Sequence, residues 1–78
     1  MKHDLKVAHE LIGFPYEIAE DIGRENGFFI YRLEEGSMET QSIAVPHHSE
    51  EEFPLGLYVN AQGEVVATTI DGNKKLAH

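Results

Sequence analysis

The chain has 78 residues, no cysteine and a formal net charge of −8. A chain of this length buries only about 60% of its unfolded surface, which predicts a single domain over residues 1–78. The missing cysteines exclude a disulfide, a thiolate metal site and a cysteine nucleophile. No signal peptide and no membrane-spanning run is found in the sequence, so we expect a soluble protein, and the sequence does not indicate its localisation.

Acidic residues are concentrated in the second half of the chain, where no lysine or arginine occurs between Leu33 and Asn73. The acidic residues of this part are Glu34, Glu35, Glu39, Glu50, Glu51, Glu52, Glu64 and Asp71. Basic groups provide much of the affinity for nucleic acids, and carboxylates repel phosphate. The charge therefore predicts no nucleic-acid or membrane partner. It is compatible with a basic protein partner or a DNA-mimic role, although solubility alone explains an acidic surface in most proteins.

A helix is predicted to begin near Pro15 and to end at Asn26 and Gly27. Proline suits a first helical position, and the acidic residues that follow it stabilise the positive end of the helix dipole. Phe14 offers no oxygen to cap the helix, and we expect it to pack back on the helix instead. A short N-terminal arm is predicted to precede the helix, and residues 1–10 do not indicate a strand.

Three strands are predicted after the helix. Residues 28–33 are rich in aromatic and β-branched side chains, whereas residues 55–59 and 64–70 flank turn residues and indicate a β-hairpin. The order predicts an α+β domain in which one helix packs on a small mixed β-sheet, with a long exposed loop between the first two main strands. The termini, about 1–5 and 73–78, are expected to be mobile. The predicted core residues are Leu11, Ile12, Ile18, Ile22, Phe28, Ile30, Leu57, Val59, Val66 and Ile70.

The long loop, residues 37–54, is the candidate functional segment. Loops longer than about 12–15 residues are uncommon in compact domains and are usually functional or disordered. The candidate residues for contact with a protein partner are Met38, Glu39, Thr40, Gln41, Ser42, Ile43, Ala44, Val45, Pro46, His47 and His48. An alternative interpretation gives Ile43, Ala44 and Val45 a structural role, either as a short extra strand or packed on the core.

Catalysis and metal binding find little support in the sequence. His47 and His48 lie beside three glutamates, but neighbours in an extended chain point to opposite sides and no third, suitably spaced ligand follows. No glycine-rich phosphate loop and no nucleophile elbow occurs. The sequence therefore predicts no enzyme, no metal site and no cofactor.

Three short motifs occur along the chain: Leu11-Ile12-Gly13 before the helix, residues 31–37 leading into the loop, and residues 57–60 before the closing hairpin. Together they resemble the potato inhibitor I family of serine-protease inhibitors, which includes eglin. The resemblance covers roughly residues 5–72. It implies one helix on a small mixed sheet and an exposed loop that inserts into a protease as a substrate would. A serine protease is the partner that the resemblance implies.

The loop departs from the pattern of that family in two respects. Counting forward from Gly36 places the reactive bond at Gln41–Ser42, whereas counting back from the next strand places it just after His48. Two arginines that support the loop in eglin-like inhibitors correspond to Pro54 and Gly56 here. Arg32, on the preceding strand, is the remaining candidate for this support.

Two other interpretations stay open. The first is a non-inhibitory interaction module that binds a basic protein through its acidic face. The second is a wall-binding module, because residues 13–19 and the Gly27-Phe28 pair are similar to PASTA domains, in which a strand precedes the helix. The chain is expected to be a monomer or a weak homodimer, the latter if its aromatic residues do not all fit one side of the sheet.

Overall fold

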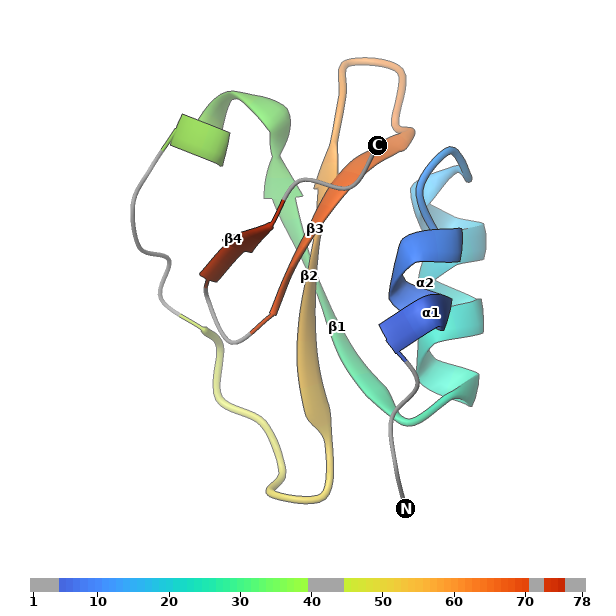
Figure 1. Cartoon of the computed structure of the whole chain (residues 1–78), viewed down its shortest axis with the longest axis vertical. Coiled ribbons are helices and arrows are strands. Elements are labelled where there is room, and N and C mark those ends of the chain that lie inside the picture. Colours follow the sequence, from blue (N-terminus) through green and yellow to red (C-terminus); the bar gives the residue numbers. More distant parts are fainter. Residues whose placement is uncertain (1–4, 40–44, 71–72, 76–78) are drawn as a thin grey trace.

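The computed structural model describes residues 5–39, 45–70 and 73–75. Along the chain it contains α1 (Leu5–Glu10), α2 (Tyr16–Glu25), β1 (Phe28–Glu34), the 3-10 helix η1 (Glu35–Glu39), β2 (Phe53–Val59), β3 (Val65–Ile70) and β4 (Asn73–Lys75). The strands form one sheet in the order β1-β2-β3-β4, with both α-helices on the same side of it (Figure 1). The predicted α+β class, with a helix packed on a small mixed sheet, is confirmed.

The sheet is mixed because β1 and β2 are parallel, whereas β2–β3 and β3–β4 are antiparallel. Parallel neighbours cannot be joined by a tight turn, since the chain must return to the end of the sheet where the first strand began. At about 3.3 Å per residue, the seven residues of β1 require a return of about 23 Å. Residues 35–52, which we call the crossover, make this return. Much of its length is therefore a requirement of the topology.

The start of α2 is capped by backbone groups of another segment and not by a side chain. Pro15 occupies the N-cap position without a side-chain hydrogen bond, and the first helical amide, Tyr16 N–H, donates to Gly63 O at 2.9 Å. Backbone bonds between Gly13 and Val65 (2.8 Å) and between Val65 and Phe14 (2.9 Å) continue this pairing. The turn between β2 and β3 thus satisfies one of the amides that are left free at the start of a helix. Phe14 is 40% exposed, and its expected packing on the helix stays a prediction.

That turn is shaped by one asparagine and one glycine. The Asn60 Oδ1 atom accepts hydrogen bonds from the Gln62 and Glu64 amides at 2.9 and 3.0 Å. Gly63 has a φ of 83°, which side chains rarely tolerate. At the other end of α2, Asn26 Nδ2 donates to Ile22 O at 2.8 Å and Gly27 adopts a φ of 88°. The predicted helix stop is confirmed.

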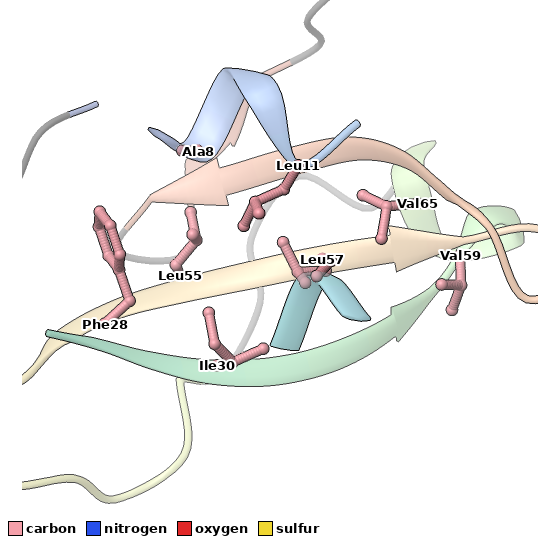
Figure 2. Close-up of a cluster of buried hydrophobic side chains, with 9 residues drawn as sticks. Ala8, Leu11, Phe28, Ile30, Leu55, Leu57, Val59 and Val65 are labelled. Carbon is pink, nitrogen blue, oxygen red and sulfur yellow. The ribbon is translucent and has the colours of Figure 1, made fainter. Parts of the chain in front are cut away.

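The core lies between the helices and the face of the sheet that carries Leu55, Leu57 and Val59 (Figure 2). Of the predicted core residues, five are buried: Leu11, Phe28, Ile30, Leu57 and Val59. Three more are partly buried and pack against this cluster: Ile12, Ile22 and Ile70. Ala8, Ala19, Leu55 and Val65 join the cluster without having been predicted.

Two core predictions fail for identifiable reasons. Ile18 is 48% exposed because the buried residues of α2 are Ala19 and Gly23, which turn Ile18 towards solvent. Gly23 permits a close approach to the sheet, since a Cβ there would lie 2.5 Å from Ile30 Cδ1. Val66 is only half-buried, because the pairing of β2 and β3 shifts register between Tyr58 and Val59 and places Val65 opposite Val59. A shift of one residue reverses which side chains face the core.

Three short elements were not predicted. α1 replaces part of the predicted N-terminal arm and carries the buried Ala8, while residues 73–75, predicted as mobile tail, pair with β3 as β4. η1 directly follows β1. Elements of three to six residues are too short to show a clear hydrophobic period. Residues 5–13 are helical or turn and Pro15 makes only an isolated β-bridge to Glu64, so the strand expected of a PASTA module is not found within residues 5–15.

Candidate functional site

Residues 35–39 and 45–52 of the crossover lie on the side of the sheet away from the helices (Figure 1). We call this side the second face, and it carries Phe29, Tyr31 and Leu33 of β1 together with Gly56 and Tyr58 of β2. Tyr31 and Tyr58 are buried although neither belongs to the core cluster between the helices and the sheet. Aromatic side chains thus occupy both faces of the sheet, with Phe28 on the helix side. The tyrosines on which the homodimer prediction partly rested are covered within the chain.

The first residues of the crossover form a regular turn. Residues 35–39 wind into η1, which contacts both β1 and β2. The Ser37 hydroxyl donates a hydrogen bond to Glu34 O at 2.7 Å. The first residues of the predicted loop are therefore regular, because the 3-10 helix and this hydrogen bond order the chain as far as Glu39.

The last residues of the crossover form a second ordered turn. Ser49 N–H donates to Glu52 Oε1 at 3.0 Å, and the Ser49 hydroxyl accepts from Glu51 N–H at 3.1 Å. The Glu52 amide closes the turn on Ser49 O at 3.1 Å. A serine followed three residues later by a glutamate is the sequence signal for such reciprocal bonds, and it could have revealed this turn. β2 begins directly afterwards at Phe53, so Phe53 and Pro54 belong to the sheet and not to the loop.

His48 fastens this end of the crossover to the second face. Its ring stacks on Phe29 with 5.4 Å between ring centroids and 29° between the planes. Its Nδ1 atom lies 2.8 Å from Ser49 O, and since a carbonyl oxygen only accepts, Nδ1 is the donor. Phe29 was not predicted as a functional residue, because nothing local in the sequence links it to the distant His48.

The candidate contact residues are described only in part. Met38 and Glu39 lie at the end of η1, and Thr40, Gln41, Ser42, Ile43 and Ala44 lie outside the described residues. Val45 is half-buried without strand structure, whereas Pro46 and His47 are exposed. Pro46 and His47 are therefore the candidates that the described structure offers to a partner.

The positions that correspond to the supporting arginines have a different role here. Gly56 lies beneath the Tyr31 ring, because an added Cβ would be 2.8 Å from two ring carbons. Arg32 points to the helix side, where its guanidinium lies 5.5 Å from the centre of the Tyr16 ring and 3.4 Å from Glu34. The interpretation of Arg32 as support for the loop is therefore wrong. Aromatic contact through Phe29 takes the place of ionic support in the described part of the crossover.

The hydroxyl of Tyr58 is buried on the second face and has no hydrogen-bond partner among the residues that the structure describes. Tyr58→Phe is expected to raise the free energy of unfolding by about 1 kcal/mol at neutral pH, because desolvating an unpaired hydroxyl costs roughly that much or more. Urea unfolding of the two proteins measures the difference. A loss of stability in the variant would show that the hydroxyl is bonded.

The same hydroxyl predicts a difference at high pH. Burial raises the pKa of Tyr58 above its ordinary value of 10.0. As the pH rises above 10, the unfolded chain therefore releases this proton at a lower pH than the folded protein does. The free energy of unfolding of the unsubstituted protein then falls until the pH has passed the raised pKa, by up to about 1.4 kcal/mol per pH unit. The pKa of Tyr16 is also raised, chiefly by burial, but this contribution is present in both proteins and cancels. The advantage of Tyr58→Phe should grow between pH 9 and 11.

Acidic side chains surround both ends of the crossover. Those that are exposed are Glu34, Glu35, Glu50, Glu51, Glu52 and Glu64. Across the described part of the chain, the ion pairs are Arg24–Glu20 at 2.8 Å and Arg32–Glu34 at 3.4 Å. No three histidine, aspartate or glutamate side chains in that part cluster closely enough to bind a metal ion together.

Comparisons of the chain with protein-family models, with curated proteins and with solved structures found no match. None of the helices within residues 5–39, 45–70 and 73–75 is long and apolar enough to cross a membrane.

Proposed function

We propose that this chain is a small protein-binding domain that uses residues 37–54 as its contact segment, in the manner of a potato inhibitor I serine-protease inhibitor. The observation that carries the proposal is a crossover between parallel strands that is fastened at both ends. Ser37 bonds to Glu34 at one end, and His48 stacks on Phe29 at the other. Pro46 and His47, close to the second attachment, are exposed.

The proposal has a physical basis in conformational entropy. A segment that is already ordered loses little freedom on binding, so more of the contact energy appears as affinity. The turn of Ser49 and Glu52 and the stacking of His48 restrict the crossover from the side of β2. The proline at position 46 also keeps Val45 away from helical conformations, which suits the extended form that proteases accept.

A second candidate, a module that binds a basic protein through its acidic face, is favoured by the exposed glutamates. Glu50, Glu51 and Glu52 have no ion-pair partner among the described residues. Binding of this kind depends on charge and weakens strongly as salt shortens the screening length from about 14 Å at 0.05 M to about 4 Å at 0.5 M. Insertion of a loop into a protease is expected to tolerate the same change.

The test is to incubate the protein with subtilisin, elastase and chymotrypsin. The residual protease activity and the masses of all fragments are then measured. We expect at least one protease to be inhibited at both salt concentrations while the chain is cut slowly at one bond between Met38 and Ser49. Rapid cutting of this segment without inhibition would contradict the inhibitor proposal. Binding to a basic protein that disappears at high salt would select the second candidate.

A matched pair of variants tests the attachment of the crossover. His48→Ala removes the ring that stacks on Phe29, whereas His47→Ala makes the same change at an exposed neighbour. An aromatic stack contributes about 0.5–1.5 kcal/mol, so the His48→Ala protein should be cut about 2- to 13-fold faster than the His47→Ala protein. Equal cleavage rates would show that the stack does not hold the segment.

A further inference from the structure

A groove of about 420 Å³ lies where the end of α2, the start of β1 and the end of the crossover meet. Its lining residues are Arg24, Gly27, Phe28, Phe29, Glu51 and Glu52. Glu51 and Glu52 come from the turn that ends the proposed contact segment, so the groove adjoins the surface that a partner of this segment would cover. The groove is distinct from the exposed Pro46 and His47 and offers a second point of contact.

The charge of the groove is unbalanced. Its one basic side chain, Arg24, is bound to Glu20 at 2.8 Å, an (i, i+4) pair on α2. Glu51 and Glu52 are both exposed and have no ion-pair partner in the part of the chain that the structure describes. Between Leu33 and Asn73 the chain has no lysine or arginine of its own to place beside them. No basic side chain of the described residues neutralises Glu51 and Glu52, so a cationic group of a partner would find both carboxylates available.

The apolar part of the lining restricts the kind of cation. Phe29, which is only half-buried, is among the lining residues, and a small hydrated ion would gain nothing from its ring. An arginine side chain has an apolar stem and a planar guanidinium that contacts aromatic rings and binds carboxylates through two parallel hydrogen bonds. Its two halves match the two parts of the lining.

We propose that this groove binds an arginine side chain of the protein partner, with the stem against Phe29 and the guanidinium on Glu51 and Glu52. The inference rests on the proposed function, since it takes the partner of residues 37–54 to be a protein. It adds a specificity to that function, because a partner is expected to carry an exposed arginine beside the surface that the crossover covers.

The test is an NMR titration of the full chain, labelled with nitrogen-15, with the capped peptide Gly-Gly-Arg-Gly-Gly. The reference peptide carries citrulline, which has the shape of arginine without its charge. We expect the amide signals of Phe29, Glu51 and Glu52 to move with a dissociation constant of about 1 mM for arginine, and not for citrulline. Equal shifts with both peptides, or shifts confined to other residues, would overturn the proposal.

Variants separate the groove from the general negative field of the chain. The double variant Glu51→Gln with Glu52→Gln should weaken arginine binding about fivefold or more, while Glu50→Gln, an exposed neighbour outside the lining, should change it less than about twofold. Glutamine at position 52 keeps an oxygen that can accept the hydrogen bond from the Ser49 amide, so the turn is preserved. Equal weakening by Glu50→Gln would show that only net charge matters and would overturn the specific site.

The groove and the proposed function can fail separately. Arginine binding that needs Glu51 and Glu52 in a chain that inhibits no protease would support the groove and contradict the inhibitor role. A chain that inhibits a protease, but shows no arginine-specific shifts at the groove, would overturn the groove alone.

Discussion

Leu57→Ala is expected to lower the free energy of unfolding by about 2–5 kcal/mol, the cost of removing a leucine side chain from a packed interior. Leu57 is fully buried in β2 and lies within the core cluster beneath the helices. Domains of this kind are stabilised by only about 5–15 kcal/mol, and small ones are at the lower end. The substitution should therefore bring the protein close to unfolding at room temperature.

Leu33→Ala is the matched control for this prediction, because the same atoms are removed from a half-buried leucine on the second face of β1. Its cost should be less than about half as large, since part of the side chain is already in water. Urea unfolding followed by circular dichroism gives both values, provided that the slope of the free energy with urea is unchanged. Equal losses would mean that the second face is packed as tightly as the core.

Gly56→Ala should cost about 2 kcal/mol, although the substitution adds only one methyl group. The new Cβ would lie 2.7 Å from Thr69 Cγ2 and 2.8 Å from two carbons of the Tyr31 ring. Both neighbours are buried, so the ring cannot move away freely, and overpacking of this kind costs about 1–3 kcal/mol. The smaller backbone entropy of alanine in the unfolded chain offsets part of this.

Gly36→Ala is the control for this change, because a Cβ at Gly36 meets nothing within 4 Å. Its effect on the unfolding free energy should stay within about 0.5 kcal/mol. The Tyr31 ring lies 6.2 Å from that of Phe29, on which His48 stacks, so Gly56→Ala should also speed cleavage of the crossover by proteases. A Gly56→Ala protein as stable as the Gly36→Ala protein would show that the second face has room that its packing does not suggest.

Much of the fold follows from local patterns in the sequence. The aromatic and β-branched run of β1, the turn residues between β2 and β3, and the Asn26-Gly27 helix stop each act over a few residues, and all three predictions agree with the structure. The position of the crossover was also evident, because it is the gap between two clear strands. Its composition, however, did not reveal how its ends are held.

Other features depended on residues far apart in the chain. The parallel pairing of β1 with β2 accounts for much of the length of the crossover, and it places Phe29 where His48 can stack on it. The exposure of Ile18 and the orientation of Arg32 depend on how closely α2 approaches the sheet.

The sequence by itself determined which segments become α2 and the three longest strands, because backbone preference and side-chain alternation act between near neighbours. The tertiary structure alone decided the parallel order, the one-residue shift that buries Val65 in place of Val66, and the groove beside Glu51 and Glu52. These arise when distant segments meet, and the free energy that selects them comes from packing and pairing across the whole sheet.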